Sequence, residues 1–204
     1  MNPALKTALS TTFGMLLAGS ALLAHADDAA IKKPVRASID SFQNDTLMIT
    51  TRAGAHQSIK VTDQTAIRSL SKANLEDIKP GSFVGSAAMP QPDVTLKALE
   101  VTVFEASLKG SGEGHYGWEN ADGTTGSMTN GTVGALKKAN GRTLTVQYKG
   151  GEKQLVVPDD VPVAYVEPAD RSALKAGAKI VLFPADDGSA RGIAVGKDGY
   201  TPPQ

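Results

Sequence analysis

The sequence predicts an all-β protein made of two similar five-stranded OB-like small barrels in tandem, joined by a glycine-rich insert. Two observations lead to this fold class. Short segments of alternating apolar and polar residues recur along the chain, and the pattern of its first half returns in its second half. Alternation with a period of two is typical of half-buried strands. An internal repeat indicates that one structural unit is used twice.

The repeat is visible when residues 59–81 are placed over residues 155–177. Identical residues then correspond in the pairs Val61 and Val157, Asp63 and Asp159, Ala73 and Ala169, Lys79 and Lys175, and Gly81 and Gly177. The two aspartates follow predicted strands, where a carboxylate typically caps a backbone turn. We therefore expect both aspartates to be structural.

Each unit begins with a predicted hairpin. Residues 35–39 and 46–50 flank Asn44-Asp45 in the first unit, and residues 132–136 and 143–148 flank Asn140-Gly141 in the second. Asn-Gly between alternating apolar residues is the strongest short-range signal for a hairpin. The first two strands of each unit are therefore expected to pair with each other.

The remaining elements follow in the same order in both units. We predict a third strand at 58–61 or 154–157, about one helical turn before Gly81 or Gly177, a fourth strand at 83–84 or 179–183, and a fifth at 98–104 or 192–195. Three strands, a short helix and two more strands is the element order of an OB-like barrel. A single sandwich built from both units is the alternative, and only the strand pairing separates the two.

The chain divides into four predicted segments: a signal peptide at 1–26, a first OB-like domain at 27–104, the insert or linker at 105–130, and a second OB-like domain at 131–204. Lys6 precedes an apolar run that ends before Ala24-His25-Ala26, which is the order of a cleavable secretory signal. After this segment no stretch is apolar enough to span a bilayer. We expect a periplasmic protein, with secretion to the medium as the alternative.

Composition narrows the functional classes. The chain has 21 Lys and Arg residues against 21 Asp and Glu residues, and its longest basic runs are the pairs Lys32-Lys33 and Lys137-Lys138. Nucleic-acid binding requires clustered positive charge, so it is not expected. The absence of cysteine excludes disulfides and a lipidated cysteine.

The insert holds the candidate binding residues. Large aromatic side chains and an imidazole gather in a stretch rich in glycine, where loops on a rigid β scaffold often carry function. The predicted ligand-binding residues are His115, Tyr116, Trp118 and Glu119. Alternatively, Trp118 and Tyr116 pack into the groove between the two units and fix their relative angle.

A transition-metal site is the second possibility for the insert. Glu113, His115 and Met128 supply carboxylate, imidazole and thioether groups, which borderline and soft metal ions accept. One histidine with scattered carboxylates lacks a recognised ligand spacing, however. No cofactor is therefore expected, with a weakly bound transition metal as the alternative.

Catalytic chemistry has little support. The sequence has no cysteine nucleophile and no G-x-S-x-G motif, and after residue 26 only His56 and His115 could act as a base at neutral pH. We therefore predict that the protein is not an enzyme.

Several segments resemble a family of uncharacterised exported proteobacterial proteins. They are residues 77–86, Gly112-Glu-Gly-His115 with Trp118, Ser127-Met-Thr-Asn130, and residues 196–203. The two halves are also similar to a small repeated domain of unknown function built on a Leu-Lys-x-Gly element. The resemblance implies export and β architecture. Some members are labelled metal ABC transporter permeases, a label that the lack of a spanning segment after residue 26 contradicts.

These observations predict a non-enzymatic periplasmic binding or envelope-associated protein. Its insert would present residues 113–128 to an envelope protein or a small ligand that the sequence does not identify. Weak metal handling is the alternative function, and a role as a structural spacer also stays open.

Overall fold

The computed structural model describes residues 33–138 and 142–203. The described chain is all-β, and its helical segments are single 3-10 turns. Among these residues, no helix combines the length and apolar character needed to span a bilayer. The predicted signal peptide and the Asn140-Gly141 turn lie outside the described residues.

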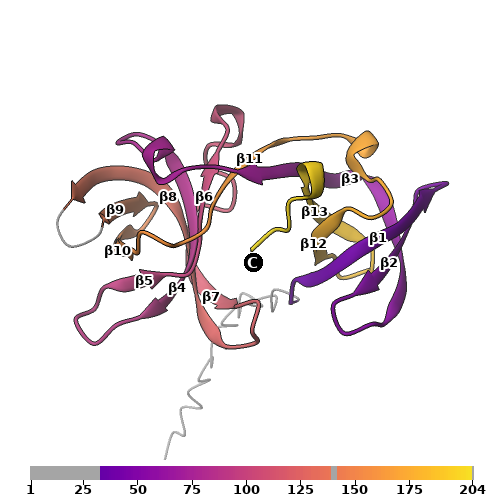
Figure 1. The fold of residues 1–204 in the computed structure, drawn as a ribbon, viewed down its shortest axis with the longest axis horizontal. Helices are drawn as coiled ribbons and strands as arrows, with labels where there is room; N and C mark the ends of the chain where they lie inside the picture. Colours follow the sequence, from indigo (N-terminus) through magenta and orange to yellow (C-terminus); the bar gives the residue numbers. More distant parts are fainter. Residues whose placement is uncertain (1–32, 139–141, 204) are drawn as a thin grey trace, which may run out of the picture. The chain divides into compact units, whose positions relative to one another are not determined.

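In the part of the chain that the structure describes, thirteen strands form one continuous sheet. Figure 1 labels each of them. They are β1 (Val35–Gln43), β2 (Thr46–Thr51), β3 (His56–Lys72), β4 (Phe83–Pro90), β5 (Leu96–Ala98), β6 (Val101–Phe104), β7 (Gly114–Glu119), β8 (Thr125–Lys138), β9 (Arg142–Tyr148), β10 (Gly151–Val157), β11 (Val163–Pro168), β12 (Lys179–Pro184) and β13 (Ala190–Gly196). The 3-10 turns are η1 (Leu75–Asp77), η2 (Ala106–Leu108), η3 (Arg171–Ala173) and η4 (Lys197–Gly199).

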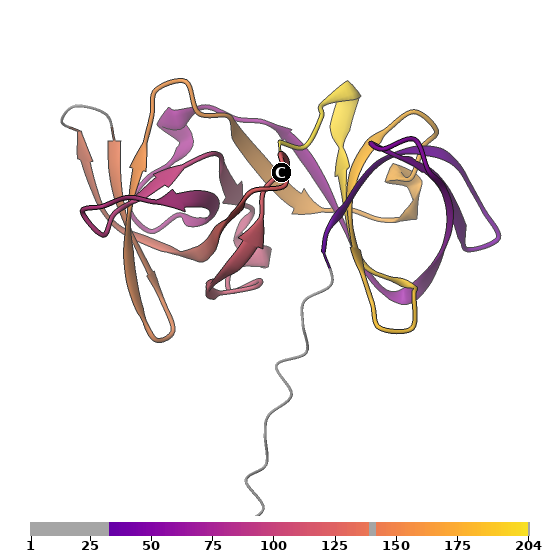
Figure 2. The same cartoon turned by 90° about the horizontal axis from the view of Figure 1, so that it is seen from below.

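Five of these strands close into a β-barrel, called the first barrel below. β1 pairs with β2, β2 with β3, β3 with β13, β13 with β12, and β12 again with β1. The β3–β13 pair is parallel and the others are antiparallel. Figure 2 shows this barrel as a ring in which the indigo strands of the N-terminal part meet the yellow strands of the C-terminal part.

A second circuit of pairings follows the same strand order. β8 pairs with β9, β9 with β10, β10 with β5, β5 with β4, and β4 again with β8. Here too, only the pair between the third and the last strand, β10 and β5, is parallel. These five strands are called the second circuit below.

The strand pairing differs from the expected one. The expected domains, 27–104 and 131–204, would each close on their own strands. Instead β12 and β13 complete the first barrel with β1–β3, while β4 and β5 complete the second circuit with β8–β10. Each ring of pairings therefore takes its first three strands from one half of the chain and its last two from the other half.

The long strand β3 is the physical reason for this exchange. It continues to Lys72, and its last part pairs with β11, which runs antiparallel to it. In this ribbon Leu70 pairs with Val166, and these two residues also correspond in the repeat alignment. The chain that follows β3 and the chain that follows β10 thus cross between the two rings in opposite directions. They cross at equivalent points of the repeat.

Two main cores lie inside the two rings. The first contains Ile39, Leu47 and Leu182, and the second contains Leu144 and Leu155; all five are at most 2% exposed. Each buried leucine contributes about 1.5–3 kcal/mol relative to full exposure.

The 3-10 turns pack on these cores, as the sequence predicts. Ile78, directly after η1, lies in the second core, and Leu174, directly after η3, lies in the first. Gly81 and Gly177 follow with φ of 88° and 84°, a backbone region that glycine enters without steric cost. The expected helical stops are therefore confirmed.

Candidate binding site on strand β7

The segment 105–130, expected as an insert or linker, contains two stretches of β structure. β7 and the start of β8 form a hairpin whose turn is built by local polar contacts. The Asp122 carboxylate accepts from the Thr124 backbone N–H at 2.9 Å, and Gly123 adopts a φ of 83°. The glycines of β7 and β8 weaken the alternating pattern, so the sequence does not reveal these strands.

β7 is the end strand of the sheet. Within residues 33–138 and 142–203, only β8 pairs with it. Asn120 donates its backbone N–H across the turn to Thr124 O at 2.9 Å, so the hydrogen-bonded pairs of this hairpin fall on the even-numbered residues of β7. The backbone groups of His115, Gly117 and Glu119 therefore point away from β8, toward the open edge.

The end of β7 contacts the first barrel. The Arg36 guanidinium donates to the Glu119 carbonyl at 3.0 Å, which agrees with an outward-pointing backbone at that residue. Arg52 donates to Ala121 O at 3.4 Å, and Lys33 forms an ion pair with the Glu119 carboxylate. Of the predicted binding residues, Glu119 is thus already engaged by both its main chain and its side chain.

His115 lies on one face of the hairpin. Its Nδ1 is 2.9 Å from the Thr129 hydroxyl, and its ring stacks on Tyr148 with centroids 6.2 Å apart. Burial, and then the positive charge of Lys153, lower the pKa of His115 from its ordinary value. The imidazole is therefore neutral at pH 7, with Nε2 as the nitrogen that Thr129 does not occupy.

Tyr116 lies on the opposite face because neighbouring residues of a strand alternate. Its hydroxyl oxygen accepts from Asn130 Nδ2 at 3.0 Å and lies 3.5 Å from Gly112 O, to which the hydroxyl donates. Burial raises the pKa of this phenol, and the nearby charge of Arg191 lowers it by less. Tyr116 thus ties β7 to the segment before it.

Trp118 is in a packing position. Its ring lies 6.3 Å from the ring of Phe183 on β12, and its indole N–H is buried without a hydrogen-bond partner. This contact joins the hairpin to the first barrel. It matches the alternative interpretation of Trp118 as a residue that fixes the packing of the insert.

The three expected metal ligands do not surround one point. In the β7–β8 register His115 pairs with Thr129, whereas Met128 pairs with Tyr116, so the imidazole and the thioether project from opposite faces. The Glu113 carboxylate accepts from the Lys149 backbone N–H at 3.0 Å. The described residues also hold no cluster of three or more His, Cys, Asp or Glu side chains suited to a metal ion. The described structure therefore does not bring Glu113, His115 and Met128 together at one point.

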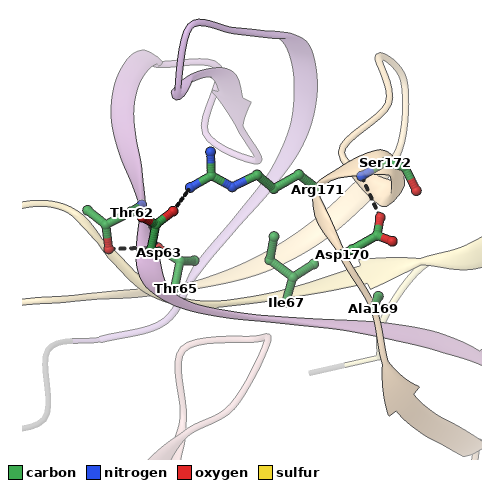
Figure 3. Close-up of a pocket in the computed structure, with 8 residues that line it drawn as sticks. All are labelled: Thr62, Asp63, Thr65, Ile67, Ala169, Asp170, Arg171 and Ser172. Carbon is green, nitrogen blue, oxygen red and sulfur yellow. Dashed lines mark hydrogen bonds and ion pairs between the residues drawn. The ribbon is translucent and has the colours of Figure 1, made fainter.

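A shallow hollow of about 390 Å³ lies between β3 and η3 (Figure 3). The close-up shows Arg171 reaching Asp63, at 2.8 Å, while Asp170 accepts from the Ser172 backbone N–H. Arg171 also pairs with Asp45. Because this guanidinium already binds two carboxylates, it is not a free cation for a ligand. The Asp63 carboxylate, expected to cap a backbone turn, instead forms an exposed ion pair with Arg171.

A second hollow, of about 640 Å³, lies at the corresponding place beside η1. It includes Asp159, the repeat counterpart of Asp63, and an ion pair between Arg142 and Glu76. The η segment and the facing strand are again joined by an arginine and a carboxylate. Neither hollow is lined by the predicted binding residues.

Glu100 is a buried acid that no sequence pattern marks. It lies between β5 and β6 and is 5% exposed. Burial raises the pKa of its carboxyl to about 8, against the opposing effect of Arg36. The Ser86 hydroxyl donates to the Glu100 carbonyl at 2.6 Å, which holds the backbone there. A lone glutamate beside an alternating strand carries no sequence signal for burial.

Comparisons with protein-family models, curated proteins and solved structures gave no significant match.

Proposed function

We propose that this chain is an exported, non-enzymatic binding protein of the bacterial envelope that holds an extended segment of a partner protein along β7. The observation that carries the proposal is the open edge of β7 within the described residues. An unpaired strand edge displays backbone donors and acceptors that an extended peptide can satisfy by adding a strand.

The side chains of β7 support this use of the edge. Five of its six residues are partly exposed and the sixth, Gly117, is exposed, so an added strand reaches the hairpin without displacing a core residue. Arg36, Lys33 and Trp118 hold one end of the strand through contacts with the first barrel. A strand that is anchored before binding loses less conformational entropy when a peptide is added.

For the scaffold, we propose that both rings are OB-like barrels derived from one repeated unit. Their shared strand order supports this, as do the matching parallel pairs β3–β13 and β10–β5. OB-like barrels commonly present ligands to strand surfaces and loops at one side of the barrel. Export is proposed from the signal-like residues 1–26 and from the family resemblance.

A proline substitution tests binding at the edge. Gly117 adopts ordinary strand backbone and points its N–H toward the open edge, and no neighbouring heavy atom lies within 4 Å of the place that a Cβ would occupy there. We expect Gly117→Pro to remove that donor and abolish peptide binding, because proline on an edge strand leaves the β7–β8 ladder intact. Gly117→Ala keeps the N–H and is the matched control.

The measurement is selection of random peptides of about ten residues, the length of a long strand, against the immobilised protein. Selected peptides are expected to bind the wild type and Gly117→Ala but not Gly117→Pro, with thermal unfolding confirming that both variants are folded. Selected peptides that bind Gly117→Pro as tightly as the wild type would place the binding surface elsewhere and refute the proposal.

A further inference from the structure

We propose that the segment held by β7 is acidic: an extended peptide with Asp or Glu side chains on both of its faces. This inference rests on the proposed function and names the class of partner. It follows from the charges that surround the two faces of β7.

Each face of β7 has a cation near its central side chains. His115 stacks on Tyr148, and Lys153 lies two residues beyond Gly151, the β10 partner of Tyr148. On the other face Trp118 contacts Phe183, and Arg191 is next to Gly192, the β13 partner of Phe183. The charge of Lys153 acts on the pKa of His115 and that of Arg191 on the pKa of Tyr116. His115 and Tyr116 project to opposite faces. Within the described residues, neither Lys153 nor Arg191 forms an ion pair.

The acids beside β7 are already engaged. Glu113 accepts from the backbone of Lys149, Glu119 pairs with Lys33, and Asp122 accepts from its own turn. Within the described residues, none of these three carboxylates forms an ion pair with Lys153 or Arg191.

Arg36 adds a third cation at the end of β7. Its Nε is buried and has no hydrogen-bond partner. Two acids act on its charge: Glu119, which also pairs with Lys33, and Glu100, which is protonated at pH 7 because its pKa lies at about 8. A carboxylate or carbonyl of an added strand beyond Glu119 would supply the missing acceptor.

Strand addition converts these positions into a recognition pattern. The backbone of the added strand would bond the outward groups of His115 and Gly117, and its side chains would alternate between the two faces. Acidic residues at neighbouring positions would then approach Lys153 on one face and Arg191 on the other. Opposite charges across paired strands stabilise the pairing.

The same charges disfavour a second copy as the occupant. Pairing two β7 edges would bring both sets of unpaired cations together, and inward-facing charge is a common device against edge-to-edge association. An acidic partner is the complementary case, because it neutralises the cations that keep two copies apart.

The test compares three fluorescent peptides that differ only in charge: (Glu-Thr)₅, (Ser-Thr)₅ and (Lys-Thr)₅, each with blocked ends. Fluorescence anisotropy is measured with the purified protein, with the double variant Lys153→Gln/Arg191→Gln, and with Gly117→Pro. We expect the glutamate peptide to bind the wild type about tenfold more tightly than the serine peptide. The double variant should lose this advantage and still bind the serine peptide.

Three results would overturn the inference. Binding of the lysine peptide as tight as, or tighter than, that of the glutamate peptide would show that the partner is not acidic. In that case, loss of binding of every peptide in Gly117→Pro would still support the proposed function. An unchanged preference for glutamate in the double variant would assign the selectivity to other residues. A dimer in sedimentation that Gly117→Pro converts to monomer would make a second copy the occupant.

Discussion

Glu100→Gln is expected to raise the free energy of unfolding by about 3 kcal/mol at pH 7. The folded-state pKa of about 8 lies above the ordinary value of 4.5, because burial disfavours the charged carboxylate. The stability associated with this group is fully present below pH 4.5 and is lost as the pH rises through about 8. Glutamine has a similar shape and does not titrate.

Urea unfolding at several pH values between 4 and 9, as rough limits, measures this effect. The wild type and Glu100→Gln should be equally stable at the acidic end, and the difference should grow as the pH rises. Glu152→Gln, an exposed position on β10, is the matched control and should show no such growth. A Glu100→Gln difference that is the same at every pH would refute the assignment of a buried, protonated carboxyl.

Leu182→Ala is expected to destabilise the protein by about 3 kcal/mol, and so is Leu155→Ala. Leu182 is 1% exposed in the first barrel, and Leu155 is fully buried in the second circuit. The two rings belong to one sheet, in which β3 of the first barrel pairs with β11, β11 with β6, and β6 with β4 of the second circuit. We expect these pairings to couple the unfolding of the two rings. Both substitutions should therefore lower one shared unfolding transition.

Calorimetry with parallel fluorescence and circular dichroism measurements tests this cooperativity. The two variants should each show a single transition, shifted by a similar amount. Two separate transitions, with Leu182→Ala moving only one and Leu155→Ala only the other, would show that the two rings unfold independently and contradict their coupling through β11 and β6.

The strands themselves were largely predictable because local alternation records them. Most predicted strands of both units are present, and the turn residues Asn44 and Asp45 adopt the positive φ values of 48° and 60° that a tight hairpin turn requires. The 3-10 turns before Gly81 and Gly177 were predictable because glycine ends such segments at a fixed place.

The pairing between the halves was not predictable. Two copies of one unit present the same faces to each other, so local pattern does not distinguish closure within a half from exchange between halves. Whether the strands close within each half or exchange between the halves depends on the long strand β3 and on β11. β11 was not predicted as a strand. An exchange of this kind is decided by tertiary contacts between distant segments.

The sequence points to the candidate residues as a group but not to their positions in the fold. One short segment, which forms β7 in the structure, contains His115, Tyr116, Trp118 and Glu119. It drew attention as a candidate binding segment because aromatic side chains between glycines are unusual for a linker. Their alternation between two faces, which separates His115 from Met128, depends on the hairpin that the glycines conceal. Lys153 and Arg191 reach β7 only through the fold, so no local pattern points to them.

The interleaved pairing places β7 at the edge of the sheet, and disulfide trapping tests it most directly. The chain contains no cysteine, so a disulfide that forms within one chain of a variant must join the two introduced cysteines. Ser38 pairs with Lys179 across β1 and β12, and paired strand residues lie within the Cα range of a disulfide. Closure within each half would instead bring Lys179 beside Thr132, the residue that pairs with Phe83 here.

The measurement is mild oxidation of Ser38→Cys/Lys179→Cys and of Thr132→Cys/Lys179→Cys, followed by non-reducing electrophoresis and mass spectrometry of the monomer. We expect a disulfide within one chain in the first variant and none in the second. A disulfide within one chain only in the Thr132→Cys/Lys179→Cys variant would contradict the interleaved pairing and, with it, the position of β7.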